Sequence, residues 1–259
     1  MKALILAAGR GRRLWPLTAE RPKCLLSLGP VTILEHQLRH LGGYGVEEIT
    51  VVAGYGFSAV RYEAEHVVGL RVRVLYNPFF ALADNLISLW SARAELEGPF
   101  VLLNGDTVFH PHVLSHHLLA VPEPSCCRLL VQRKERYNED DMMVRIDTGE
   151  PDRLLDIGKG LAPEVNDAAS IGLMRFSALG AKRLRRELEA AVIADTALQS
   201  YYLEGLKGLA TTGFEVECRD IGALAVRDID TAEDLQAVKE AYSHFLVEET
   251  LQRSRQGRA

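Results

Sequence analysis

Short apolar runs alternate with amphipathic helical patterns through the first half of the chain, and this alternation decides the fold class. Four apolar runs predict strands, at residues 3–8, 48–54, 71–77 and 99–106. Helical spacing of apolar residues follows each run, at 32–42, 58–67, 85–96 and 111–121. Parallel strands need crossover connections of this kind, because each helix returns the chain to the same end of the sheet. We therefore predict an α/β fold with a mostly parallel sheet and helices on both faces.

The second half of the chain has a different order of predicted elements, because short strand-like runs follow one another closely. These runs lie at 128–133, 142–147, 153–158, 169–176, 216–222 and 224–230. Helical patterns cover 177–192 and 231–246. The sequence shows no internal repeat and no linker-like stretch. We therefore expect one domain over residues 1–259, with a small inserted lobe in its second half.

The composition restricts the partners that this chain can have. Of the 259 residues, 47% are hydrophobic and 25% are charged, and the net charge is -5. We expect no nucleic-acid partner, because a net negative chain lacks the basic surface that such binding needs. Apolar runs of membrane-spanning length and the pattern of a signal peptide are absent from the sequence. The four cysteines form no C-x-x-C pair, so we expect a cytoplasmic protein with free thiols and no membrane partner.

A glycine turn rich in arginine follows the first predicted strand. Residues 9–13 read Gly-Arg-Gly-Arg-Arg, and Lys23 comes shortly after them. Glycine allows a positive φ and a close backbone approach, and successive N–H groups in such a turn bind anions. Neither the G-x-G-x-x-G nor the Walker pattern is present, and clustered arginines also occur on solvated faces. The glycines alone therefore leave phosphate binding and a solvated turn as alternatives.

Asp106 ends the fourth predicted strand, directly after an apolar run. Open parallel sheets bind ligands beyond the carboxyl ends of their strands, which is the edge where the glycine turn also lies. A carboxylate at this point suits a metal or nucleotide site, although Gly-Asp is also ordinary turn chemistry.

His112 and His116 are four residues apart on a predicted helix. They lack the accompanying carboxylate of a zinc motif, so we expect no histidine metal site.

The longer pattern around the glycine turn is more specific. It has the form G-x-G-x-R-L-x-P-L-T followed by P-K, with matches at Gly9, Gly11, Arg13, Leu14, Pro16, Leu17, Thr18, Pro22 and Lys23. This pattern resembles the signature of the sugar-phosphate nucleotidyltransferases. The resemblance implies a Rossmann-like fold of the nucleotide-diphospho-sugar transferase type. It also implies a mainly nucleotide-binding half at 1–125, a mainly acceptor-binding half at 126–225, and a returning metal-ligand segment with the last helix at 226–246.

Residues 76–90 resemble one branch of that family, the cytidylyltransferases that act on phosphocholine, inositol phosphate or aminoethylphosphonate. The matching positions are Asn77, Pro78, Asn85 and Ser88, whereas Asp84 stands where the branch often has a second asparagine. The branch implies Mg²⁺-dependent transfer of CMP from CTP to a small phosphate- or phosphonate-bearing acceptor, with release of pyrophosphate. Two alternatives remain. One is an enzyme that makes a nucleotide sugar from another NTP and a hexose 1-phosphate, and the other is a non-catalytic nucleotide-binding regulatory subunit.

The resemblance also implies roles for single residues. Lys23 and Arg13 would be catalytic, because they would offset charge on the α-phosphate and the departing pyrophosphate. The implied nucleotide-binding residues are Leu6, Ala7, Ala8, Gly9, Gly11, Arg12, Asn85, Ser88 and Asp106. Asp106 and Asp230 would hold Mg²⁺, which takes one or two carboxylates together with phosphate oxygens and water. Asp228 is the alternative second ligand, and Asp230 could instead cap a helix.

The implied acceptor-binding residues are Lys159, Asn77, Tyr202 and Asp141. Aromatic and acidic residues occur together at Tyr137, Asp140 and Asp141, and at Tyr201, Tyr202 and Glu204, which suits an amine-bearing acceptor. Each assignment has a structural alternative: residues 201–206 as plain core, Lys159 as an exposed loop lysine, and Asn85 with Ser88 as a helix start. We expect CTP and one small acceptor as partners, and we leave a homodimer open.

Overall fold

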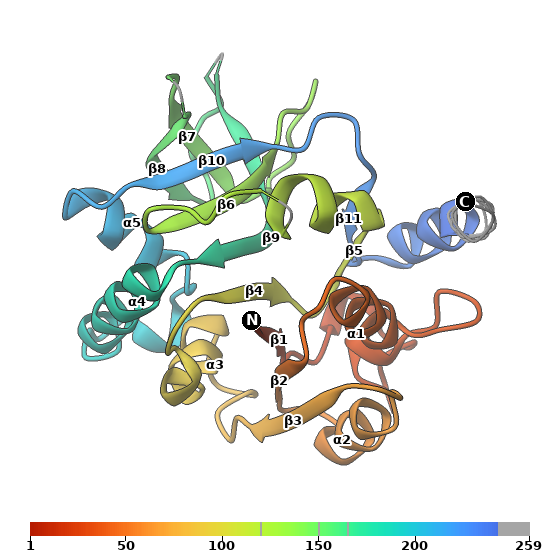
Figure 1. Cartoon of the computed structure of the whole chain (residues 1–259). Coiled ribbons are helices and arrows are strands. Elements are labelled where there is room, and N and C mark those ends of the chain that lie inside the picture. The colour runs from red at the N-terminus through yellow and green to blue at the C-terminus, as the bar shows by residue number, and fades with distance from the viewer. Residues whose placement is uncertain (120, 150, 165, 243–259) are drawn as a thin grey trace, which may run out of the picture.

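The computed structural model describes residues 1–242 except 120, 150 and 165, and within them a nine-stranded mixed sheet runs through the protein (Figure 1). Its first part contains β1 (Lys2–Ala7), β2 (Glu48–Ala53), β3 (Arg71–Tyr76) and β4 (Phe100–Asn104). These strands are parallel and lie in the order β3-β2-β1-β4. β1 is therefore central in this part of the sheet, in agreement with its almost continuous burial.

The helices of the first half lie near the predicted ranges. They are α1 (Ile33–Gly43), α2 (Phe57–Glu65) and α3 (Asn85–Ser91). Thr32 caps α1, because its Oγ1 accepts a hydrogen bond from the Glu35 N–H at 3.1 Å. The helix predicted at 85–96 is shorter than expected, since α3 ends at Ser91 and a separate 3₁₀ turn covers Arg93–Glu95. The helix predicted at 111–121 is a π-helical segment, Val113–Leu119.

The second half continues the sheet with mostly antiparallel pairs. Its strands are β6 (Cys127–Gln132), β7 (Met143–Asp147), β8 (Arg153–Gly158), β9 (Ala168–Phe176) and β10 (Val216–Asp220). The order continues from β4 as β9-β6-β10-β8-β7, and of these only β6 and β10 pair in parallel within the described residues. The α/β class is confirmed, but the parallel arrangement holds mainly for the first half. The short β7–β8 connection accounts for one of the antiparallel pairs, because a short link can join antiparallel strands only.

Apolar side chains of β1 alternate between the two faces of the sheet and reach different helices. Leu4 and Leu6 belong to the core under α3, α4 (Ala178–Ala191) and α5 (Glu204–Thr211). Ile5 belongs to the core under α1 and α2. This period of two places successive strand residues on opposite faces, so both faces of β1 are covered by helices. Figure 1 shows α3 and α4 on one side of the strands, with α1 and α2 on the other.

A small second sheet lies beyond the carboxyl end of β4 (Figure 1). β5 (Thr107–Phe109) pairs in antiparallel register with β11 (Val226–Asp228), and Thr107 is opposite Asp228. The Ile229 N–H also donates to the Asp106 carbonyl oxygen at 3.1 Å. Residues 232–242 are helical, and the rest of the predicted helix 231–246 lies outside the described residues. The β5–β11 pair thus brings a late segment of the chain to the end of β4.

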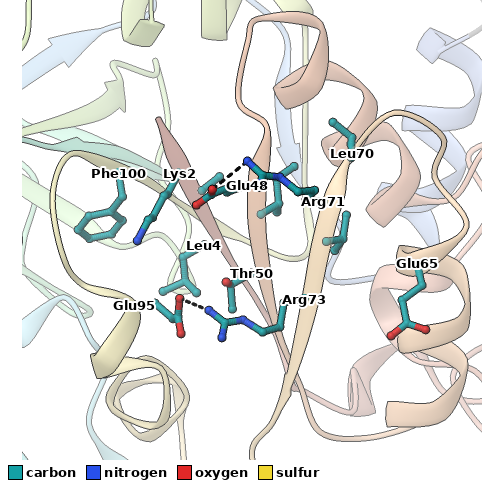
Figure 2. Close-up of a pocket in the computed structure, with 13 residues that line it drawn as sticks. Lys2, Leu4, Glu48, Thr50, Glu65, Leu70, Arg71, Arg73, Glu95 and Phe100 are labelled. Carbon is teal, nitrogen blue, oxygen red and sulfur yellow. Dashed lines mark hydrogen bonds and ion pairs between the residues drawn. The ribbon is translucent and has the colours of Figure 1, made fainter.

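A cavity of about 430 Å³ lies at the opposite, amino-terminal edge of β1–β4 (Figure 2). Lys2, Glu48, Arg71 and Phe100, the first residues of the four strands, all line it. An ion pair joins Arg71 to Glu48 at 3.0 Å on one of its walls. This cavity is far from the glycine turn, so it does not belong to the predicted site. None of the helices in the described part of the chain is long and apolar enough to cross a membrane.

Candidate active site

The glycine turn leaves the carboxyl end of β1, and its two glycines have different roles. Gly11 has a φ of +65°, and its carbonyl oxygen accepts a hydrogen bond from Thr18 Oγ1 at 2.8 Å. A Cβ on Gly11 would lie 3.0 Å from Lys23 Cβ, so this glycine also lets Lys23 pack against the turn. Gly9 is exposed, has no positive φ, and a Cβ there would meet nothing within 4 Å. Gly11 therefore shapes the turn, whereas Gly9 leaves an open backbone surface.

The backbone before the turn holds the neighbouring strand ends in place. Leu6, Ala7 and Ala8 are buried. The Leu6 carbonyl oxygen accepts from Gly105 N–H at 2.8 Å, and the Ala8 carbonyl oxygen accepts from Tyr55 N–H at 3.1 Å. A Cβ on Gly105 would lie 2.7 Å from both Ala7 Cβ and the Leu6 carbonyl oxygen. Only a glycine allows this close approach, which carries the adjacent Asp106 to the glycine turn.

Lys23 lies between two carboxylates from distant parts of the chain. Its Nζ is 2.6 Å from Asp106 Oδ2 and 2.8 Å from Asp230 Oδ1, and its side chain is only 12% exposed. Burial works against the charged ammonium, but Asp106 and Asp230 outweigh that effect, so the pKa of Lys23 is raised. Burial likewise opposes the charge of Asp230, yet Lys23 and then Arg13 hold the pKa of that carboxyl below its usual value. Lys23 and Asp230 are therefore both charged at neutral pH.

Arg13 extends this arrangement towards Asp140, which precedes β7. One guanidinium nitrogen lies 2.9 Å from Asp230 Oδ1, and another pairs with Asp140. Asp140 Oδ1 in turn lies 3.4 Å from Nζ of Lys159, which follows β8. Negative and positive side chains therefore alternate along a row of contacts that runs from Asp106 to Lys159. Each of the three cations in this row is paired with a carboxylate of the same chain. These cations are Lys23, Arg13 and Lys159.

Arg12 and Arg10 lie on the same turn as Arg13. Arg12 is exposed in the 3₁₀ turn Arg12–Leu14. The Arg10 guanidinium carbon lies 5.4 Å from the ring centre of Tyr55 and 5.5 Å from that of Phe80, within range of a cation–π contact with each. Arg10 is thus held over aromatic rings at the ends of β2 and β3, and Arg12 is presented to solvent.

Asp228 is close to this group but is engaged differently. Its Oδ1 accepts a hydrogen bond from Thr107 Oγ1 at 2.6 Å. Burial and the nearby Asp106 carboxylate raise the pKa of Asp228 to about 7, although the Thr107 hydrogen bond acts in the opposite direction. Asp230 rather than Asp228 shares Lys23 with Asp106, so the geometry favours Asp230 as the partner of Asp106.

The polar side chains after β3 that match the cytidylyltransferase pattern mainly support the local fold. Asn77 is fully buried, donates from Nδ2 to Ser88 Oγ at 3.0 Å, and accepts from Phe79 N–H at 2.9 Å. Asn85 Oδ1 accepts from the Tyr202 N–H at 2.9 Å. The Asn77 amide is therefore enclosed in this structure, and its acceptor-binding role stays a prediction. Ser88 is also buried, whereas Asn85 is partly exposed and its nucleotide-binding role stays a prediction.

Two further residues with a predicted acceptor role, Tyr202 and Asp141, make contacts within the protein, and their role stays a prediction. Tyr202 is fully buried, and its hydroxyl lies 3.0 Å from Asn104 Oδ1, so it packs in the core beneath β4. Asp141 accepts from Lys134 Nζ at 2.8 Å and from Asn138 N–H at 2.9 Å, which fixes the 138–141 turn. The neighbouring Asp140, not Asp141, faces Arg13 and Lys159.

Tyr201, the residue next to Tyr202, makes an aromatic contact with Lys159. Lys159 Nζ lies 5.2 Å from the ring centre of Tyr201. The sequence indicated that acidic and aromatic residues occur together near 140 and near 201. It did not show which residue of the pair Asp140 and Asp141, or of the pair Tyr201 and Tyr202, faces Lys159. Adjacent residues differ here because one side chain packs inward and its neighbour points outward.

The donor set suits a hard cation that also binds the substrate. Asp106 and Asp230 converge on one position, which a cationic ammonium already occupies. Among the residues that the structure describes, no group of three or more histidine, cysteine or acidic side chains is arranged to hold a metal alone. Two carboxylates completed by phosphate oxygens and water are typical of Mg²⁺. The residues therefore fit a magnesium ion that arrives with a nucleotide.

The fold and this group of charged residues define a nucleotidyltransferase. The model of the MobA-like NTP transferase domain matches residues 3–205, and the chain belongs to that family. Among its relatives is the CMP-5'-(3-aminopropyl)phosphonate synthase of Streptomyces rubellomurinus, 33% identical over 244 residues. That match covers 90% of this chain but 37% of the relative, so the chain spans well under half of its length.

Another relative has nearly the same length as this chain. The 2-aminoethylphosphonate cytidylyltransferase of Lancefieldella rimae is 27% identical over 245 residues, which cover 94% of each chain. The inositol-1-phosphate CTP transferase of T. maritima has a similar solved structure, with a TM-score of 0.78 and 23% identity. It matches 94% of this chain and 95% of its own, and it confirms the fold. The expected resemblance to cytidylyltransferases is thereby confirmed.

Proposed function

We propose that this protein transfers CMP from CTP to a small phosphate- or phosphonate-bearing acceptor and releases pyrophosphate. The observation that carries the proposal is the convergence of Lys23 and Arg13 with Asp106 and Asp230 at the carboxyl ends of β1 and β4. Ligands of open α/β sheets bind at this edge. The cations suit phosphate oxygens, and the carboxylates suit a metal bound to those phosphates.

The reaction needs positioning and charge neutralisation rather than proton transfer. An acceptor oxygen attacks the α-phosphorus of CTP, the new P–O bond forms, and the bond to the bridging oxygen of pyrophosphate breaks. A phosphate or phosphonate dianion is already a nucleophile, so no residue has to act as a base. Lys23 and Arg13 offset the charge that develops on the α-phosphate and on the leaving pyrophosphate.

Asp106 and Asp230 are the residues that would hold Mg²⁺. When bound, the metal would neutralise phosphate charge and help to orient the nucleotide and the acceptor. The Lys23 ammonium lies between the two carboxylates, and this contact supports the assignment because it brings a positive charge to the position that a metal would take. The open backbone at Gly9 would provide the surface on which the triphosphate lies.

The acceptor would approach from the inserted lobe, where Lys159, Asp140 and Tyr201 lie together. Lys159 suits a phosphoryl or phosphonyl group. The Asp140 carboxylate and the Tyr201 ring together suit an amine. The two curated relatives described above are named for aminoalkylphosphonates, which have both groups. An aminoalkylphosphonate is therefore the acceptor class that we favour.

A turnover screen tests this function directly. CTP, UTP, GTP and ATP are each incubated with 2-aminoethylphosphonate, phosphocholine, inositol 1-phosphate or glucose 1-phosphate, and pyrophosphate release is measured. We expect turnover with CTP and an aminoalkylphosphonate, and none with metal-free buffer. Preference for a hexose 1-phosphate with another NTP would replace the proposal by nucleotide-sugar synthesis. Nucleotide binding without turnover on any acceptor would support a regulatory subunit.

A further inference from the structure

Lys23 occupies the place between Asp106 and Asp230 that a divalent cation would need. Its Nζ makes contacts of 2.6 Å and 2.8 Å with the two carboxylates, and little of its side chain is exposed. The Asp106 and Asp230 carboxylates repel each other in a partly buried site, so a cation between them stabilises the ligand-free protein.

The stem of Lys23 is restrained, whereas its ammonium is held by ion pairs alone. Lys23 begins a 3₁₀ turn whose next residues, Cys24 and Leu25, are buried. Its Cβ and Cδ lie 3.0 Å and 3.4 Å from the position that a Cβ on Gly11 would take. The outer part of the side chain can turn about its last bonds without moving the glycine turn. The ammonium can therefore exchange one set of anionic partners for another.

We propose that Lys23 is an internal counterion that keeps divalent metal out of the ligand-free protein. This inference rests on the proposed function for the identity of the ligands that displace it. A divalent ion and the Lys23 ammonium compete for the same carboxylate oxygens, so the metal binds weakly while Lys23 is in place. The phosphates of a nucleotide offer the ammonium new partners, after which the carboxylates accept the metal. Metal and nucleotide thus bind with positive coupling.

Mn²⁺ binding to the ligand-free protein tests this competition without any turnover. The free ion is measured by electron paramagnetic resonance during titration of wild type, Lys23→Met and Lys134→Met. Lys23→Met should bind Mn²⁺ about tenfold more tightly than wild type, because it removes the competing charge and keeps the stem. Lys134→Met removes an equal charge, but Lys134 pairs with Asp141 and not with Asp106 or Asp230, so its Mn²⁺ affinity should stay close to wild type.

A thermal melt provides a second readout and controls for folding. Lys23→Met should melt at a lower temperature than wild type in metal-free buffer, because its carboxylates lack a counterion. Added MgCl₂ should raise the melting temperature of Lys23→Met more than that of wild type. The double variant Lys23→Met/Asp106→Asn should lose both the tighter Mn²⁺ binding and the stabilisation by MgCl₂.

Two results would overturn the proposal. One is equal Mn²⁺ affinity of folded wild type and folded Lys23→Met. The other is tighter binding that persists in the double variant, since the metal would then bind elsewhere. Failure of every acceptor in the turnover screen would reject the proposed reaction and leave the metal result standing. Turnover of CTP together with unchanged Mn²⁺ affinity would reject the counterion role alone.

Discussion

Lys23 and Asp230 lie 2.8 Å apart although 207 positions separate them in the chain. Their contact links the glycine turn after β1 with the segment that follows β11, and Asp106 completes it from the end of β4. The same contact neutralises both partners in the absence of a ligand. Under the proposed function, nucleotide and metal would therefore exchange partners within an existing ion network rather than fill an uncharged cleft.

Lys23→Ala should reduce CMP transfer by about 10² to 10⁴-fold, because it removes a cation that offsets transition-state charge. The measurement is pyrophosphate release at saturating CTP and acceptor. Circular dichroism and a melting curve should show a folded protein. A folded variant with nearly wild-type turnover would remove Lys23 from the catalytic role.

Substitution of Asp228 and Asp230 by asparagine, one at a time, should identify the second metal ligand. We expect Asp230→Asn and Asp106→Asn to lose nearly all metal-dependent turnover, because their oxygens converge on one position. Asp228→Asn should keep most of its rate, since Asp228 is held by Thr107 and an amide resembles its protonated form. The turnover rate of each variant is measured against Mg²⁺ concentration. A lower rate for Asp228→Asn than for Asp230→Asn would assign the metal to Asp228.

Asp140→Asn should bind inorganic phosphate about two- to fivefold more tightly than wild type at low salt. The reason is that Asp140 pairs with both Arg13 and Lys159, and these exposed ion pairs compete with a free anion. Calorimetric titration with phosphate measures the gain, which should shrink as salt is added. Asp147→Asn is the matched control, because it removes an equal charge at the far end of β7 and should not change the affinity. No gain in Asp140→Asn alone would show that Asp140 does not compete with anions.

Gly9→Ala should leave stability within about 0.5 kcal/mol of wild type but weaken CTP binding. A Cβ at Gly9 meets nothing in the protein, and the residue has no positive φ, so any effect must come from the ligand. Gly43→Ala is the control, since its Cβ also meets nothing and Gly43 lies at the end of α1. Equal CTP affinities of the two variants would show that the triphosphate does not lie on the backbone at Gly9.

His36 should make the protein less stable as the pH falls below about 6.5. Burial, and then the charge of nearby His40, hold the pKa of His36 well below 6.5, so it is neutral in the folded protein. The unfolded chain takes up a proton below that pH, and unfolding is favoured by about 1.4 kcal/mol per pH unit for this group. The stability that neutral His36 contributes is complete above pH 6.5 and is lost as the pH falls below that value.

Urea unfolding between pH 5 and 7 measures this slope in wild type, His36→Gln and His66→Gln. His36→Gln should have a flatter pH dependence because it removes the buried histidine, which packs against Phe109 and lies 3.1 Å from the Tyr242 hydroxyl. His66→Gln, at an exposed position, should keep the wild-type slope. Identical slopes in all three proteins would contradict the assignment.

The local sequence pattern was sufficient to predict the elements of the first half of the fold and part of the candidate site. The apolar runs and helical spacing predicted β1 to β4 within a residue or two, because strand and helix periods are properties of neighbouring residues. Lys23, Arg13 and Asp106 were also predicted, since they follow recognisable strand ends or match the signature of the family. They converge in the structure as the topology of a parallel sheet requires.

Tertiary packing decided what the pattern left open. The resemblance implied Asp230, with Asp228 as the alternative, and Asp230 reaches Lys23 because β11 pairs with β5, a contact between residues more than a hundred positions apart that no local period records. Asn77, Tyr202 and Asp141 were chosen by chemical type, yet the structure encloses or engages their side chains and presents Asp140 and Tyr201 instead. Residue type states which chemistry a side chain can perform, but its direction depends on the elements packed against it. The sequence by itself therefore determined the class of fold and the charged turn, and only the three-dimensional packing determined which acids meet those cations.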